Sequence, residues 1–81
     1  MIIRVRLFAA ARELAGSGSL QVDVRKGATI ADVRRAVEAA VPALQNILSH
    51  SLWAIDAEYA ADDAIVTQHS DIALIPPVSG G

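Results

Sequence analysis

The sequence has no cysteine, few aromatic residues and no long apolar run. Without cysteine the chain forms no disulfide, has no thiolate metal site and lacks a cysteine nucleophile. The longest uninterrupted apolar run, Leu7 to Ala11, is far shorter than a membrane span, and arginines break up any stretch that resembles a signal peptide. We therefore expect a soluble, cytoplasmic protein with an unprocessed N-terminus and no membrane partner.

The usual signatures of catalysis are also missing from the sequence. There is no metal-ligand spacing, no glycine-rich phosphate loop and no recognisable Ser/His/Asp set. His50 and His69 stand in loop-like contexts and are assigned no role, and the adjacent Asp62 and Asp63 are typical of a solvated turn or helix cap. We expect no metal, no cofactor bound by the chain itself and no enzymatic activity of the chain alone.

Basic residues are lacking in the second half of the chain. Residues 1–40 hold all seven basic and four acidic groups, whereas residues 41–81 hold five acidic groups. The basic residues are not interleaved with aromatic ones and the pI is about 5.5, so we predict no binding to nucleic acid. A partner that receives the acidic, C-terminal end is expected to present Lys or Arg.

What the sequence does contain is a set of short, alternating segments. Apolar and other residues alternate from Ile3 to Phe8 and from Leu20 to Val24, which predicts two half-buried strands. A third strand is predicted over Leu52–Ile55 and a last one over Asp71–Pro76. The segment Asp56–Asp63 is predicted to be a short hairpin or loop.

One main helix is predicted between the second and third strands. Thr29 is a suitable N-cap and Asp32 follows three residues later, as in a capping box. Ile30, Val33, Val37 and Val41 then mark one helical face. Short helical turns are expected at Ala9–Leu14 and, after Pro42, around Leu44–Leu48.

This order of elements predicts an α+β domain of the β-grasp, or ubiquitin-like, type. A mixed sheet would wrap around the main helix, and residues 1–81 would form a single domain. At least one of the three large aromatics, Phe8, Trp53 and Tyr59, is expected in the core of a domain this small, and Trp53 is the one we assign there. Tyr59 stands among acidic residues and alanines, which favours an exposed position.

The C-terminal end differs in kind from the rest of the chain. The apolar segment Ile72–Ile75 runs into Pro76 and Pro77, and the last four residues are Val78, Ser79, Gly80 and Gly81. Prolines favour an extended exit from the sheet, and glycines without side chains fit a narrow channel. We expect a flexible tail over residues 77–81 whose delivered group is the carboxylate of Gly81. A bare Gly-Gly end is weak evidence, but the fold pattern and the proline pair strengthen it.

With Phe8, the run Arg12-Glu13-Leu14 before Gly16, and the ending Pro-Pro-Val-Ser-Gly-Gly, the sequence resembles the MoaD-type small subunit of molybdopterin synthase, of the MoaD/ThiS sulfur-carrier family. The resemblance spans the whole chain. It implies that a ubiquitin-activating-type adenylyltransferase uses ATP and Mg to adenylate Gly81, and that a sulfur donor converts the adenylate to a thiocarboxylate. A large synthase subunit then uses this sulfur to convert cyclic pyranopterin monophosphate to molybdopterin during molybdenum cofactor biosynthesis.

The same resemblance implies a heterotetramer with the large subunit, which holds the catalytic side chains. It implies that Gly80 and Gly81 carry the tail chemistry, and that Arg12 steers the tail. Residues that match or neighbour the family's partner surface are Phe8, Arg12, Tyr59, Leu74 and Ile75. Leu74 and Ile75 replace aromatics that are common in the family, and Gln68–Asp71 replaces its usual acidic, glycine-containing turn. We therefore expect an apolar patch with a shape of its own.

Three other functions fit the same features. A sulfur carrier of the thiamine-thiazole type shares the fold and the Gly-Gly end, although the Pro-Pro-Val-Ser lead-in favours the molybdopterin branch. A ubiquitin-like modifier would join Gly81 to lysines of other proteins. A β-grasp interaction module with an inert tail would keep its activity when Gly80 and Gly81 are deleted.

Overall fold

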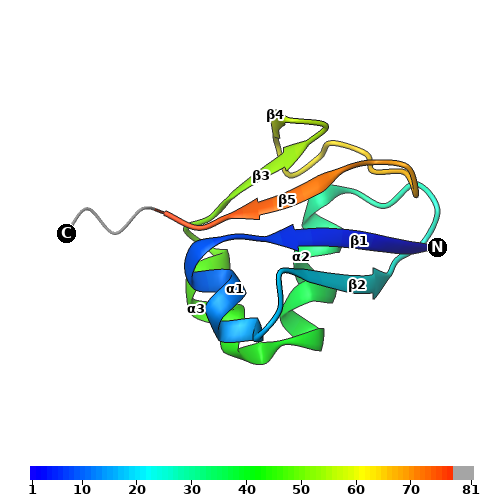
Figure 1. Cartoon of the computed structure of the whole chain (residues 1–81). Helices are drawn as coiled ribbons and strands as arrows, with labels where there is room; N and C mark the ends of the chain where they lie inside the picture. The colour runs from blue at the N-terminus through cyan, green and yellow to red at the C-terminus, as the bar shows by residue number, and fades with distance from the viewer. Residues whose placement is uncertain (78–81) are drawn as a thin grey trace.

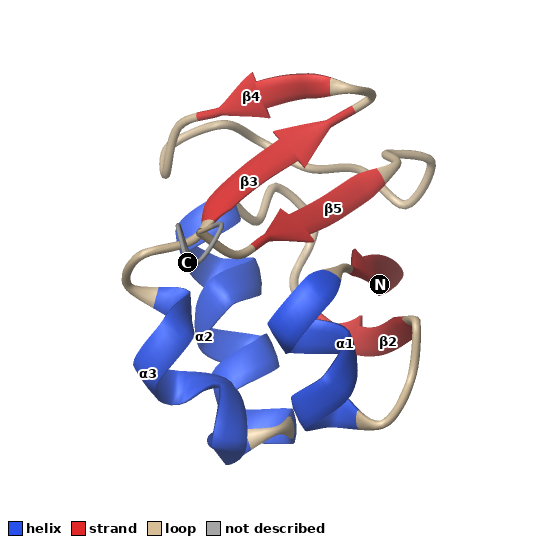
Figure 2. Cartoon of the chain, turned by 60° about the vertical axis from the view of Figure 1, so that its left-hand side comes forward, coloured by secondary structure: helices blue, strands red, loops and turns tan. Residues whose placement is uncertain are grey.

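The computed structural model describes residues 1–77, which form one five-stranded sheet with its helices packed on one side (Figures 1 and 2). The elements in chain order are β1 (Ile2–Leu7), α1 (Ala9–Ala15), β2 (Ser19–Asp23), α2 (Ile30–Ala40), η1 (Pro42–Leu44), α3 (Gln45–Leu48), β3 (Leu52–Ile55), β4 (Glu58–Ala60) and β5 (Ile72–Ile75). Every predicted strand and helix is present, within about two residues of its expected bounds.

The strand order is β2-β1-β5-β3-β4. β1 and β5 pair in parallel, and every other neighbouring pair is antiparallel. Because β1 and β5 run parallel, their C-terminal ends lie next to each other at the same end of the sheet. This mixed sheet around one main helix is the β-grasp fold, so the predicted fold class is confirmed.

The helix α2 begins as the sequence predicts. The Thr29 hydroxyl accepts a hydrogen bond from the Asp32 amide, and the Asp32 carboxylate accepts one from the Thr29 amide at 2.9 Å. Ile30, Val33 and Val37 are fully buried against the sheet, whereas Val41 is the C-cap and is only partly buried. The capping box and the apolar face together fix where α2 starts and which side faces the core.

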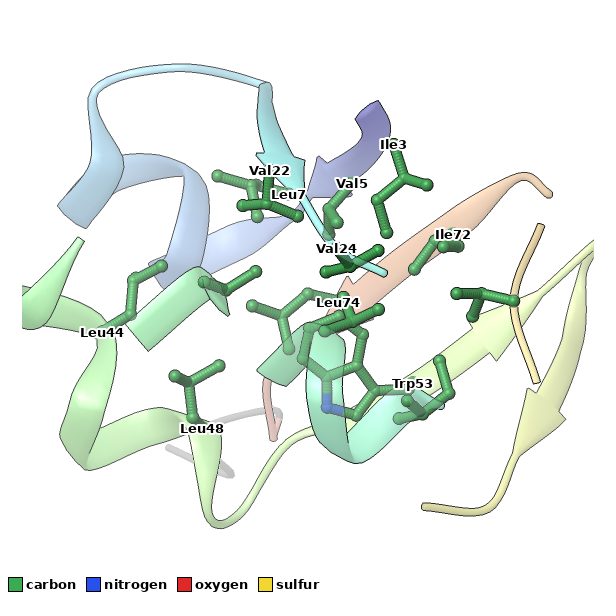
Figure 3. Close-up of a cluster of buried hydrophobic side chains, with 14 of the residues drawn as sticks. Ile3, Val5, Leu7, Val22, Val24, Leu44, Leu48, Trp53, Ile72 and Leu74 are labelled. Atoms are coloured by element: carbon green, nitrogen blue, oxygen red, sulfur yellow. The ribbon is translucent and has the colours of Figure 1, made fainter. Parts of the chain in front are cut away.

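The core lies between the helices and the inner face of the sheet (Figure 3). Ile3, Val5 and Leu7 of β1 point into it, as their alternation with exposed residues predicts. Trp53 is 3% exposed, so its predicted place in the core is confirmed. Its indole Nε1 is buried and has no hydrogen-bond partner within residues 1–77.

The segment Asp56–Asp63, predicted to be a short hairpin or loop, holds the turn and second strand of a hairpin, since a two-residue turn joins β3 to β4. Asp56 and Ala57 make the turn with φ values of 52° and 69°, and Ile55 pairs with Glu58. Positive φ at both central residues matches the twist of a two-residue hairpin. Before β5, the turn Thr67–Ser70 is closed by a hydrogen bond from the Ser70 amide to the Thr67 carbonyl.

An ion pair joins α2 to the loop that follows β4. The Arg34 guanidinium donates two hydrogen bonds to Asp62, at 2.7 and 3.1 Å, which lowers the pKa of Asp62 and raises that of Arg34. Asp62 thus has the structural role that its position in a loop suggests.

Within residues 1–77, no helix has the length and apolar character that a membrane crossing requires.

Candidate functional site

The outer face of the sheet carries a row of paired residues that crosses four strands. Arg6 pairs with Ala73, Ala73 with Ala54, and Ala54 with Tyr59. Directly paired residues project to the same face, so two alanines lie between a large cation and a large aromatic ring. Because Ala54 and Ala73 have small side chains, the outer face is hollowed between Arg6 and Tyr59.

The next row lies closer to the end of β5 and is apolar. Leu52 pairs with Ile75, and Phe8 is an extended residue that directly follows β1. Continuing the β1–β5 register by one residue brings Phe8 beside Ile75. We call Phe8, Leu52, Tyr59 and Ile75 the sheet-face patch.

The sheet-face patch is unusually open for its size. Phe8 is 42% exposed, Leu52 54% and Tyr59 75%, while Ile75 is half-buried. Exposed apolar side chains gathered on one face, with small residues between them, are typical of a protein-binding surface. The predicted exposure of Tyr59 is confirmed.

Arg6 holds one side of this surface in place. Its guanidinium carbon lies 5.6 Å from the centroid of the Phe8 ring, within the range of a cation–π contact. The same guanidinium donates a hydrogen bond of 2.9 Å to Asp71, just before β5. Arg6 therefore links Phe8 to the start of the last strand and limits the orientations of the ring.

The segment that leads to the C-terminus leaves the sheet beside this patch. β5 ends at Ile75, Pro76 is buried and Pro77 is exposed. A proline has no amide hydrogen to donate, so Pro76 and Pro77 cannot continue the hydrogen bonding of β5 and the strand ends before them. Val78, Ser79, Gly80 and Gly81 of the predicted tail lie outside the described residues.

Leu74 differs from its expected position on the partner surface. Its side chain is 0% exposed and packs in the core with Ile72, because alternate residues of β5 face the helices. Its neighbour Ile75 faces outward, as expected. Leu74 therefore supports the sheet beneath the patch and contributes no surface to it.

Leu52 is the patch residue that the sequence reading missed. The signal was present, because Trp53 was assigned to the core and its neighbour in a strand must then face outward. With 54% exposure beside Ile75, Leu52 contributes the surface that the resemblance assigns to Leu74.

Arg12 lies apart from the sheet face, on α1. It is exposed and lines a shallow hollow with Glu13 and the loop Gly16–Gly18. Gly18 lies beside the Arg12 guanidinium, and an added Cβ there would be 3.8 Å from its Nε, an ordinary van der Waals contact. Phe8, Tyr59 and Ile75 thus lie on one surface. Arg12 lies one helical turn after Phe8, whose carbonyl accepts a hydrogen bond from the Arg12 amide at 3.4 Å, and its part in the partner surface stays a prediction.

Two of the five acidic groups of the second half lie at the start of β5. They are Asp56 and Asp71, and the Asp71 amide donates to the Asp56 carboxylate at 2.9 Å. Pro76 and Pro77 follow the other end of that strand. A partner that presents Lys or Arg to the C-terminal end stays a prediction.

Within residues 1–77, no group of three or more His, Asp or Glu side chains is arranged to hold a metal ion. His50 and His69 are both exposed and lie in different loops. The groups with shifted pKa values, among them Asp32 and Asp62, belong to the capping box and ion pairs of α2. The sheet-face patch and the segment that leaves beside it form the candidate functional site.

Comparison with known proteins finds relatives over almost the whole chain. The model of the ThiS family matches residues 5–81. The chain is 38% identical over 79 residues to the molybdopterin synthase sulfur carrier subunit of Arabidopsis thaliana, covering 98% of this chain and 82% of that protein. It is 36% identical over 84 residues to small archaeal modifier protein 1 of Haloferax volcanii, covering 94% of this chain and 97% of that protein.

The crystal structure of small archaeal modifier protein 1 from Haloferax volcanii superposes with a TM-score of 0.88 at 34% identity, covering 100% of both chains. A sulfur carrier subunit from Chlamydomonas reinhardtii, also named for molybdopterin synthase, is 34% identical over 83 residues, covering 100% of both chains. The chain therefore belongs to the ThiS family, and its predicted resemblance to the small subunits of molybdopterin synthase is confirmed.

Proposed function

We propose that this chain is the sulfur-carrying subunit of a molybdopterin synthase. The observation that carries the proposal is the parallel pairing of β1 and β5, which makes the C-terminal segment leave the sheet beside an open apolar patch. A carrier needs both parts together, a surface that binds its partner and a tail that enters the partner's active site. The names of the relatives from Arabidopsis thaliana and Chlamydomonas reinhardtii support the same role.

The chemistry of the proposal takes place at the carboxyl group of Gly81. A carboxylate is a poor electrophile, so a ubiquitin-activating-type adenylyltransferase first joins it to AMP and releases pyrophosphate from Mg-ATP. A sulfur donor then displaces AMP, which leaves a thiocarboxylate at Gly81. In the synthase the sulfur passes to cyclic pyranopterin monophosphate, and the acid and base side chains belong to the large subunit.

The sheet-face patch is the proposed docking surface for that large subunit. Phe8, Leu52 and Tyr59 are large apolar side chains that can insert into a partner. Between them lie the small side chains of Ala54 and Ala73, which leave room for side chains of that partner. Binding through this face directs the segment after Pro77 toward the partner, because the segment leaves from the same edge. A heterotetramer of two small and two large subunits follows if each large subunit of a dimer binds one chain.

The test is the intact mass of the chain after incubation with an adenylyltransferase, Mg-ATP and a sulfur donor. We expect the mass gain of one oxygen replaced by sulfur, located to Gly81 by fragmentation. A variant that lacks Gly80 and Gly81 should show no gain, while Ile65→Asp, on another face, should be loaded normally. A chain that stays unmodified with every component present contradicts the proposal.

A second candidate function is a ubiquitin-like modifier. It is favoured by the 36% identity to small archaeal modifier protein 1 over nearly the whole chain. Both functions need an activated Gly81 and differ in the group that attacks it, a sulfur donor in one case and an amine in the other. A thiamine-thiazole carrier would load in the same way, and transfer of sulfur to cyclic pyranopterin monophosphate would distinguish it from the first proposal.

A further inference from the structure

An apolar groove lies at the end of the sheet opposite the tail. It measures about 320 Å³ and is lined by Met1, Lys26, Ile65, Val66 and His69, among others. Ile65 is 65% exposed although it is bridged to Thr29 at the start of α2. None of these residues belongs to the sheet-face patch, so the proposed docking of the large subunit does not account for the groove.

Lys26 at the rim of this groove is the only lysine of the chain, since the other six basic residues are arginines. It is exposed in the turn after β2, and it makes no ion pair within residues 1–77. The α-amine of Met1 is already engaged, because it donates to Asp23 Oδ1 at 3.0 Å and to the Val24 carbonyl at 2.6 Å. Among the amines of the described chain, Lys26 is the one available to a nucleophilic reaction.

We propose that Lys26 is an acceptor site for a second copy of this chain, whose C-terminal segment occupies the groove. The inference rests on the proposed activation of Gly81. The apolar residues Pro77 and Val78 of the incoming copy suit the groove wall at Ile65, which is 65% exposed, whereas Val66 is buried beneath it. Before activation, the terminal carboxylate of that copy complements the Lys26 ammonium group.

The incoming segment must belong to another copy because a chain cannot reach its own groove. Ile2 pairs with Asp23 at the groove end of β1, and Leu7 pairs with Leu74 at the tail end. Five residue steps along a strand separate these pairs by about 17 Å. Pro77 lies three residues beyond Leu74, at the end of β5 opposite the groove. The four residues after Pro77 span at most about 14 Å, which is too short for the return.

The bond-forming step balances without a further reagent. The Nζ lone pair of Lys26 attacks the carbonyl carbon of the Gly81 adenylate on the second copy, and a C–N bond forms. The bond from that carbon to the phosphate oxygen breaks, AMP leaves with its electron pair, and the extra proton on nitrogen goes to solvent. The product is an isopeptide that joins two copies head to tail.

Such a bond would affect the two copies differently. The donor loses its terminal carboxyl group and can no longer carry sulfur. The acceptor keeps its own Gly81 and its sheet-face patch, since Lys26 lies at the other end of β1. Conjugation would therefore remove carriers from sulfur transfer one at a time.

The experiment uses a chain that bears an aryl thioester at Gly81, prepared by intein cleavage, as an activated donor that needs no enzyme. It is mixed with an acceptor copy whose tail ends in an unreactive amide, and products are measured by denaturing electrophoresis and mass spectrometry. We expect a dimer whose branch point maps to Lys26. Ile65→Asp in the acceptor should slow its formation at least tenfold, without changing the midpoint of unfolding.

The matched control moves the only lysine to another exposed site, as Lys26→Arg combined with Arg35→Lys on α2. This acceptor should react at least tenfold more slowly than the natural one, because Arg35 is not in the groove. Equal rates for the two acceptors, or a rate that Ile65→Asp leaves unchanged, would overturn the inference. Since the donor is activated chemically, either result is independent of whether Gly81 is adenylated and loaded with sulfur.

Discussion

Leu52 of β3 and Ile75 of β5 are directly paired, and this is the last residue pair between the two strands before the chain leaves the sheet. Leu52 is the more open of the two, with 54% of its surface exposed. An apolar pair at this rung joins the sheet-face patch directly to Pro76 and the segment beyond it. A partner that covers Leu52 is therefore already in contact with the base of the tail.

A charge at Leu52 should weaken binding of the large subunit. We expect Leu52→Asp to raise the dissociation constant at least tenfold, or about 1.4 kcal/mol, because an aspartate buried against an apolar partner loses its hydration. Isothermal titration calorimetry with the purified large subunit measures the change. Ile65→Asp, on another face and 65% exposed, is the control and should bind normally. Equal affinity of the two variants would place the docking surface elsewhere.

How much of this surface the sequence predicts depends on local pattern. Alternation along β1 identifies Ile3, Val5 and Leu7 as core residues, and the structure agrees. The run Ile72–Ile75 contains no polar residue, so its pattern cannot say which side chains face inward. The resemblance places both Leu74 and Ile75 on the partner surface, and this pattern contains nothing that separates the two. A buried Trp53 does determine the side of Leu52, by the same alternation.

The rest of the site depends on pairing between distant segments. Phe8 comes beside Ile75 only because β1 and β5 run parallel in the middle of the sheet. The contact of Arg6 with Asp71 joins residues that are 65 positions apart. Neither relationship leaves a signal in any short window of sequence, whereas the capping box of Thr29 and Asp32 does.

The turn between β3 and β4 is a site where glycine should stabilise the fold. Ala57 has a φ of 69°, a left-handed conformation that costs a residue with a Cβ about 1 to 2 kcal/mol. Ala57→Gly removes that cost, and the greater freedom of glycine in the unfolded chain offsets about 0.4 to 1 kcal/mol of the gain. We expect a net increase of about 0.5 kcal/mol in the free energy of unfolding, measured by urea titration.

The control for this prediction is Ala39→Gly, at an exposed position within α2. A glycine in a helix costs up to about 1 kcal/mol, so this variant should be less stable than the natural chain. Opposite signs for the two substitutions would confirm that backbone conformation decides the effect. A loss of stability at both positions would contradict the turn geometry.

Trp53 offers a test of its unpartnered indole nitrogen. The ring is buried, and Nε1 has no hydrogen-bond partner within residues 1–77. Trp53→Phe loses packing but also removes an N–H group whose burial costs about 1 to 3 kcal/mol. We expect this variant to lose less than about 1.5 kcal/mol, whereas Trp53→Ala should lose about 3 to 5 kcal/mol. Far-UV circular dichroism during urea unfolding measures both. Equal losses would mean that Nε1 is satisfied.

Asp32 should make the stability of the fold depend on pH in the acid range. The hydrogen bond from the Thr29 amide is the main reason that its pKa falls from 3.8 to about 2, and Arg35 at 2.6 Å adds to the effect. A carboxyl group with a lowered pKa stabilises the folded state above pH 3.8, and this contribution is lost as the pH falls toward 2. Asp32→Asn keeps an acceptor for the Thr29 amide and removes the charge.

The variant Asp32→Asn should therefore unfold at a lower urea concentration than the natural chain at pH 7, and the gap should close between about pH 4 and pH 2. Asp63→Asn is the matched control, because Asp63 is exposed and makes no ion pair within residues 1–77. Its unfolding midpoint should differ little from that of the natural chain at either pH. If the urea midpoints of Asp32→Asn and the natural chain differ by the same amount down to pH 2, the capping box stabilises α2 through its hydrogen bonds and not through the charge.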